Sequence, residues 1–134
     1  MGIEINYKET FLLKFSAMTV VAQKNDEDQY YMVGFADHET CYDNYILLQK
    51  GFDCSEEEDE DEYIEFNDQS NGRYGICSQA VLKTNCMIFT LNYSKTDITT
   101  IEVDISEVKI SDEFIKYLKF VLGNKFIIKE DNNE

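Results

Sequence analysis

The chain has 134 residues, a size that fits one domain with a single hydrophobic core. Hydrophobic residues make up 43% of it and aromatic residues 13%, which excludes a chain that is disordered throughout. Its formal net charge of −15 argues against binding to nucleic acid or to an anionic membrane surface, because both repel an acidic protein. The acidity instead fits a basic protein partner, or it serves only to keep the chain soluble.

Two features of the sequence predict a cytoplasmic protein with reduced thiols. Met1–Asn6 lacks the basic region of a signal peptide, and no apolar run approaches the roughly 20 residues of a membrane span. The four cysteines show no CxxC spacing: Cys41, Cys54, Cys77 and Cys86. A zinc site built from His38, Cys41 and Cys54 is an alternative, although these spacings match no usual ligand pattern.

The N-terminal part of the chain predicts a hairpin followed by a loop. Apolar and polar residues alternate from Phe11 towards Val21, and a second strand is expected over Gln29–Phe35 after the polar turn Lys24–Asp28. Gly34 within the second strand predicts a bulge or a close backbone approach. Ala36–Asn44 is expected to be a loop.

The middle of the chain is divided by a run of seven carboxylates, Glu56–Glu62. Such a run repels itself, so we expect all of it to face water or a basic partner. Strands are predicted on either side of it, over Tyr45–Gln49 and Tyr63–Phe66. A turn is expected over Asn67–Gly72, followed by an extended segment over Gly75–Lys83.

The C-terminal part predicts another hairpin, a further strand and one helix. Thr84-Asn85 forms the turn before a strand over Cys86–Tyr93, and strict alternation over Ile98–Ile105 places Ile101, Val103 and Ile105 inward. Ser111 is a suitable N-cap for a helix that ends before Gly123, with Phe114, Leu118, Val121 and Leu122 on its core face. Phe126–Ile128 is a candidate edge strand, and residues 129–134 are expected to fray.

Together these elements predict a single α+β domain over residues 1–134. The expected architecture is a mainly antiparallel twisted sheet, or a partly rolled barrel, with the C-terminal helix packed on one face. The sequence shows no linker and no internal repeat.

The sequence offers little material for catalysis or for a cofactor. His38 is the only histidine, and a nucleophilic pair with Cys41 would need a geometry that neighbours on one loop seldom have. Asn67–Gly72 has oxygen ligands at alternate positions, as calcium loops do, but Ser78 stands where such a loop needs a bidentate glutamate. We therefore predict no enzyme, no catalytic residue, no metal and no cofactor.

Glu65 lies on the face of its strand that points away from the expected core. Asn67 and Asp68 follow it closely, and Arg73 lies eight residues on. This arrangement fits either a solvated strand face with a local ion pair to Arg73 or a polar patch that recognises a partner.

Four segments in order resemble the Immunity protein 10 family: YMVGFAD at Tyr31–Asp37, NYILLQ at Asn44–Gln49, YIEFNDQ at Tyr63–Gln69 and GRYGI at Gly72–Ile76. The resemblance extends over Gln29–Leu91, and the seven-acid run and Cys77 depart from the family pattern. It implies a small cytoplasmic protein of a bacterial polymorphic-toxin system that binds and neutralises a cognate toxin.

The resemblance and the acidic surface together predict stoichiometric binding of a basic toxin domain such as a nuclease. The predicted partner-binding residues are the acidic run and the polar positions after it: Glu56, Glu57, Glu58, Asp59, Glu60, Asp61, Glu62, Glu65, Asn67, Asp68 and Gln69. The alternative function is a non-toxin acidic binding module that responds to calcium. The oligomeric state is left open.

Overall fold

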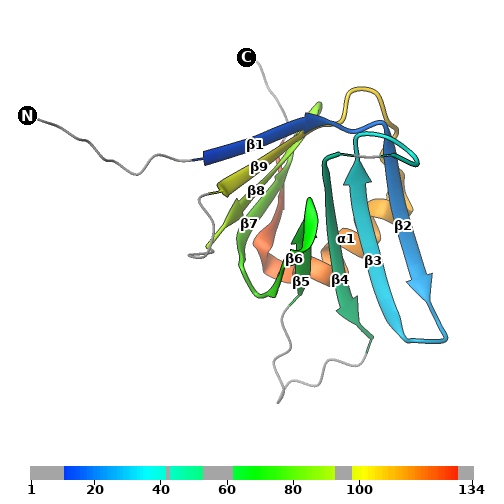
Figure 1. Ribbon diagram of the computed structural model, residues 1–134. Coiled ribbons are helices and arrows are strands. Elements are labelled where there is room, and N and C mark those ends of the chain that lie inside the picture. The colour runs from blue at the N-terminus through cyan, green and yellow to red at the C-terminus, as the bar shows by residue number, and fades with distance from the viewer. Residues whose placement is uncertain (1–10, 42, 53–61, 93–97, 130–134) are drawn as a thin grey trace, which may run out of the picture.

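The structure, a computed structural model, describes residues 11–41, 43–52, 62–92 and 98–129. These residues form two five-stranded sheets and one α-helix (Figure 1). The elements in chain order are β1 (Phe11–Ser16), β2 (Thr19–Asn25), β3 (Tyr30–Ala36), β4 (Tyr45–Gly51), β5 (Tyr63–Phe66), β6 (Asp68–Tyr74), β7 (Cys77–Leu82), β8 (Cys86–Leu91), β9 (Ile98–Asp104), α1 (Asp112–Leu122), a 3₁₀ turn (Gly123–Lys125) and β10 (Phe126–Ile128).

The first sheet has the strand order β1-β9-β8-β7-β10, and the second has the order β2-β3-β4-β5-β6. Only two of the pairings are parallel, β1 with β9 and β7 with β10. The predicted α+β class, with mainly antiparallel strands and a C-terminal helix, is therefore confirmed. The strands of the described residues divide into two sheets and form no closed barrel.

The division begins within the first predicted strand, which the structure splits between the two sheets. The Ala17 N–H donates to the Asp104 carbonyl at 2.9 Å, whereas the Met18 N–H donates to the Ala36 carbonyl at the same distance. The chain thus leaves the first sheet and enters the second within two residues. The prediction of one strand from Phe11 towards Val21 is wrong. Apolar and polar residues keep alternating through the corner at Ala17, but the backbone hydrogen bonds change there from β9 to β3.

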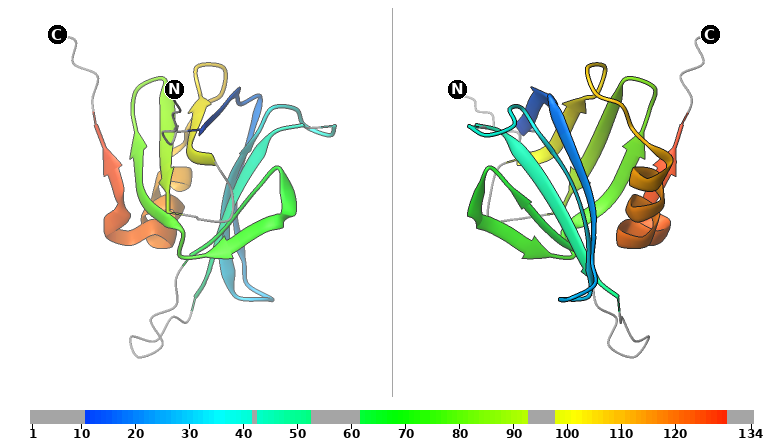
Figure 2. Two further views of the ribbon diagram at one scale, coloured as in Figure 1. Left: turned by 60° about the vertical axis from the view of Figure 1, so that its left-hand side comes forward. Right: turned by 90° about the vertical axis from the view of Figure 1, so that its right-hand side faces the viewer.

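The core lies between the inner faces of the two sheets. Phe35 of β3 meets Phe89 of β8 across it, with ring centroids 6.4 Å apart, and packs on Phe114 of the helix at 5.2 Å. Helix α1 covers the inner face of β2, β3 and β4 and also touches β10 of the other sheet (Figure 2).

The helix begins and ends where the sequence predicts. The Ser111 hydroxyl accepts a hydrogen bond from the Phe114 N–H at 3.0 Å, and Gly123 has a positive φ of 59°. All four residues predicted to face the core are buried. Each such burial contributes about 1.5–3 kcal/mol before entropy costs.

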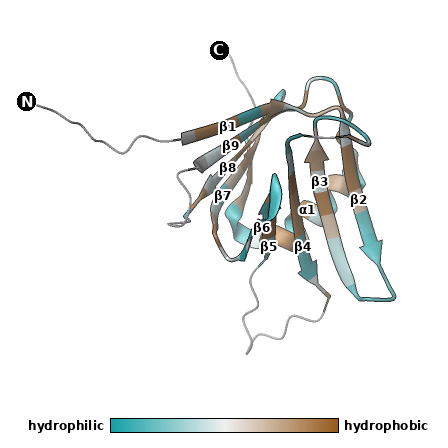
Figure 3. Cartoon of the chain, viewed as in Figure 1, coloured by the Kyte–Doolittle hydropathy of each residue, from teal (hydrophilic) through white to brown (hydrophobic). Residues whose placement is uncertain are grey.

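The turn predicted over Asn67–Gly72 is wrong, because most of it belongs to β6. Only Asn67, with a φ of 61°, adopts a turn conformation. Strand β6 is a polar edge strand that exposes most of its side chains, and Figure 3 shows it as hydrophilic. Such a strand lacks the alternation by which half-buried strands are recognised, and its polar residues are a common way to protect a sheet edge.

The other predicted strands and hairpins are confirmed within a few residues of their expected bounds. Three residues in and just after β9 were expected to face inward, and all three are buried: Ile101, Val103 and Ile105. No helix in the described part of the chain is long and apolar enough to span a membrane.

Candidate functional site

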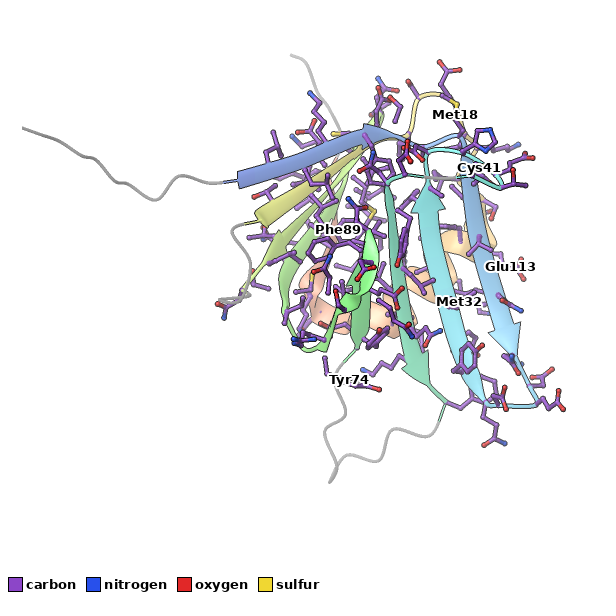
Figure 4. All side chains as sticks on the ribbon, viewed as in Figure 1. Met18, Met32, Cys41, Tyr74, Phe89 and Glu113 are labelled. Atoms are coloured by element: carbon purple, nitrogen blue, oxygen red, sulfur yellow. The ribbon has the colours of Figure 1, made fainter. Side chains whose placement is uncertain are left out.

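The outer face of the second sheet carries a groove of about 340 Å³ that runs along β3. Figure 1 views this face, with α1 behind it. The groove exists because β3 presents two small residues outward, Gly34 and Ala36, between larger residues of its neighbours. The side chains beside it are Thr19 and Val21 of β2, and Tyr45 and Leu47 of β4. In Figure 4 this stretch of β3 lies between the labelled Met32 and the sheet end marked by Met18 and Cys41.

Gly34 forms the floor of the groove. A Cβ atom at this position would lie 2.9 Å from the Ile46 carbonyl oxygen and 3.5 Å from Cδ1 of Leu47. The register between β3 and β4 is regular, so Gly34 marks a close backbone approach and not a bulge. Of the two structures predicted for Gly34, the close approach is the one found.

Glu65 of β5 lies beside the groove, and two tyrosines fix its carboxylate. The Tyr63 hydroxyl donates to Oε1 at 2.8 Å, and the Tyr45 hydroxyl donates to Oε2. Burial, together with this hydrogen bond and the negative charge of Glu65, raises the pKa of Tyr63 to about 12. Tyr63 therefore stays a protonated donor at neutral pH. The predicted outward orientation of Glu65 is confirmed, since its neighbours Ile64 and Phe66 are both buried.

Gly72 of the edge strand makes room for the Tyr63 ring. A Cβ atom at Gly72 would lie 2.6 Å from Tyr63 Cζ and closer still to the hydroxyl oxygen. Tyr74 packs on the same ring with centroids 5.3 Å apart, while itself 69% exposed. The position of the Glu65 carboxylate therefore depends on a glycine in the neighbouring strand.

The β3–β4 loop closes one end of the groove with His38 and Glu39. Asp37 holds this loop by accepting hydrogen bonds from the backbone N–H groups of Asp43 and Asn44 at 3.0 and 3.1 Å. Burial alone would raise the pKa of Asp37, but these bonds and one from the Asn44 side chain lower it below its ordinary value.

Most of the predicted acidic contact residues, Glu56–Asp61, lie outside the described residues. The last of the run, Glu62, is described and does not face water, because it is only 2% exposed. Its Oε1 accepts from the Lys125 ammonium at 2.8 Å, and its Oε2 accepts from the Cys77 N–H at 3.4 Å. The expectation that the whole run faces water or a separate basic partner is wrong for Glu62, which pairs with a lysine 63 residues later in the same chain.

The predicted polar positions after β5 divide into one half-buried residue and two exposed ones. The Asn67 side chain joins β5 to β4, accepting from the Tyr45 N–H at 2.9 Å and donating to Asn44 Oδ1 at 3.0 Å. Asp68 and Gln69 are exposed on the edge strand, and Asp68 accepts from Ser70. Asp68 and Gln69 therefore present their side chains at the sheet edge, whereas the Asn67 side chain links two strands.

The described contacts of the His38 and Cys77 side chains are with nearby backbone groups. His38 Nδ1 accepts from the backbone N–H groups of Thr40 and Cys41 at 3.1 and 3.0 Å. Burial first, and the nearby Glu62 carboxylate second, raise the pKa of the Cys77 thiol to about 12. Among the described residues no group of three His, Cys, Asp or Glu could hold a metal ion, and Cys54 of the proposed zinc alternative lies outside them.

The groove itself was not predicted from the sequence. It arises where residues of four strands meet in one cross-strand row, Val21, Gly34, Leu47 and Glu65. The one local signal was Gly34, a small residue inside a strand of large apolar ones.

Comparison with protein families gives one match, to Immunity protein 10, over residues 16–114. The match includes the whole second sheet, the groove and Glu65, and it extends beyond the Gln29–Leu91 region of resemblance on both sides. Searches of curated proteins and of solved structures gave no match. The predicted family is therefore confirmed: the chain belongs to the Immunity protein 10 family.

Proposed function

We propose that this immunity protein neutralises one cognate toxin domain in the cytoplasm by one-to-one binding, without turnover. The observation that carries the proposal is the groove on the outer face of the second sheet. There Glu65 is held by two tyrosine hydroxyls beside a groove with apolar walls. A surface whose side chains are already fixed loses little conformational entropy on binding, and it therefore suits tight recognition of one partner.

The proposed partner is basic, such as a nuclease toxin. The chain has 27 acidic and 12 basic residues, and six of the acids form the uninterrupted segment Glu56–Asp61. This segment directly precedes Glu62, which Lys125 anchors to the domain. An acidic field of this kind accelerates the encounter with a basic protein and suppresses wrong partners.

The acidic segment is tested by its effect on the association rate. Replacing Glu56, Glu57 and Glu58 by glutamine should slow association with the cognate toxin domain, and should flatten the dependence of the association rate on salt, with little change in dissociation. The matched control neutralises three exposed acids in the β2–β3 turn, at positions 26–28. Association as fast as that of the parent at low salt would show that the segment plays no part in recognition.

The calcium-responsive alternative loses its main support in the structure. The stretch that resembled a calcium loop, Asn67–Gly72, belongs mostly to β6. Within it the Asp68 carboxylate already accepts hydrogen bonds from the Ser70 N–H and hydroxyl groups. No observation favours a second function over toxin neutralisation.

A further inference from the structure

We infer that the groove along β3 receives one basic side chain of the toxin, an arginine, whose guanidinium binds Glu65. This inference rests on the proposed function, since it names the contact by which the toxin is recognised. It is carried by the shape of the groove, by the charges around it and by the fixed position of one carboxylate.

The shape of the groove suits a long side chain with an apolar stem. Val21, Gly34, Leu47 and Glu65 lie in one row across four strands, so Gly34 at the floor and Glu65 lie two strands apart, about 10 Å at the usual strand spacing of about 4.8 Å. The row begins at Val21, which is 41% exposed, passes over Gly34 and the apolar side chain of Leu47, and ends at the Glu65 carboxylate. Arginine matches this sequence of surfaces, because its methylene stem packs on apolar atoms while its charged end seeks an anion.

The charge of the groove selects a cation. The described residues that line it include two carboxylates, Glu39 and Glu65, and no lysine or arginine. Among the described lining residues the other titratable groups are the Tyr45 hydroxyl, which donates to Glu65, and His38, whose Nδ1 accepts from backbone N–H groups; the Tyr63 hydroxyl also donates to Glu65. A toxin carboxylate would be repelled at this site, whereas a guanidinium would be attracted by the carboxylates of Glu39 and Glu65.

The hydrogen bonds of Glu65 favour arginine over lysine. Each carboxylate oxygen accepts one tyrosine hydroxyl and keeps a further acceptor site, so both oxygens together can take the paired N–H groups of a guanidinium. A lysine ammonium is a point charge and gains less from two oxygens in a fixed plane. The tyrosines also remove the rotamer freedom that Glu65 would otherwise lose on binding.

The test uses two pairs of matched variants and the cognate toxin domain. Glu65→Gln removes the anion, and Glu113→Gln removes a control carboxylate that also accepts a tyrosine hydroxyl, from Tyr117 at 3.0 Å on α1. Val21→Arg places a competing cation in the groove, and Leu12→Arg adds the same charge at an exposed apolar position of the other sheet. Urea unfolding of each variant first establishes that it is folded.

We expect Glu65→Gln and Val21→Arg to raise the Kd for the toxin domain about 10- to 100-fold, and the two controls to change it less than about threefold. Substituting the toxin's arginines one at a time should then reveal one whose loss weakens binding to the parent chain but not to Glu65→Gln. Two outcomes overturn the inference while leaving the proposed function intact. In the first, the parent binds the toxin domain and both groove variants bind it as tightly as the control variants do. In the second, no toxin arginine couples to Glu65. Failure of the parent itself to bind would instead refute the proposed function.

Discussion

Removing Lys125 should destabilise the protein far more than removing an exposed lysine. The Glu62 side chain is 3% exposed and Lys125 27% exposed, with 2.8 Å between the ammonium nitrogen and the carboxylate oxygen. Loss of one partner from a buried ion pair costs about 3–5 kcal/mol, because it leaves an uncompensated buried charge. Since Lys125 is partly open to water, we expect Lys125→Met to lower the free energy of unfolding by about 3 kcal/mol, at the lower end of that range.

The matched control is Lys14→Met. Its ammonium lies 3.9 Å from Glu102 and its side chain is 61% exposed, so this change should cost about 0.5 kcal/mol or less. Urea unfolding followed by circular dichroism measures both variants, and equal m-values would show that the same surface is exposed on unfolding.

A double variant tests whether the two residues act as a pair. Glu62→Gln combined with Lys125→Met has no buried charge left, and its amide can still accept from the Cys77 N–H. It should therefore be more stable than Lys125→Met alone by about 1–2 kcal/mol. If Lys125→Met is as stable as the Lys14 control, or if the double variant is the less stable one, Glu62 is not held in the way the structure indicates.

Further predictions concern Tyr63 and the cysteines. Because the pKa of Tyr63 in the folded protein, about 12, exceeds its ordinary value of 10.0, its contribution to stability should be complete below pH 10 and be lost as pH rises to about 12. Gly72→Ala should push the Tyr63 ring away from Glu65 and return its pKa towards 10, and an unchanged spectrophotometric titration would contradict the packing described. Under native conditions an alkylating reagent should modify the exposed Cys41 and spare the buried Cys77; peptide mass spectrometry would show the reverse if the burial of Cys77 were wrong.

Elements with strong local signals were predictable from the sequence. Strand β9 alternates strictly, with Ile101 and Val103 inward and Glu102 between them. The helix was equally clear, because Ser111 and Gly123 mark its two ends by chemistry that acts within one turn.

Features that depend on distant residues were not predictable. The corner at Ala17 depends on backbone partners in other strands. Glu62 was predicted to be solvated like the other six acids of its run, because no residue near it in sequence indicates the ion pair with Lys125. The orientation of Glu65 followed from alternation, but its two tyrosine donors come from different strands, and Tyr63 reaches it only because Gly72 lies opposite.

Titration of the cognate toxin domain with the parent chain tests the proposed neutralisation most directly. Toxin activity and heat of binding are measured on the same samples. We expect heat release to end at one chain per toxin domain and residual activity to fall in proportion to the free toxin. Absence of a complex at micromolar concentrations, or inactivation of many toxin molecules by one chain, would contradict neutralisation by stoichiometric binding.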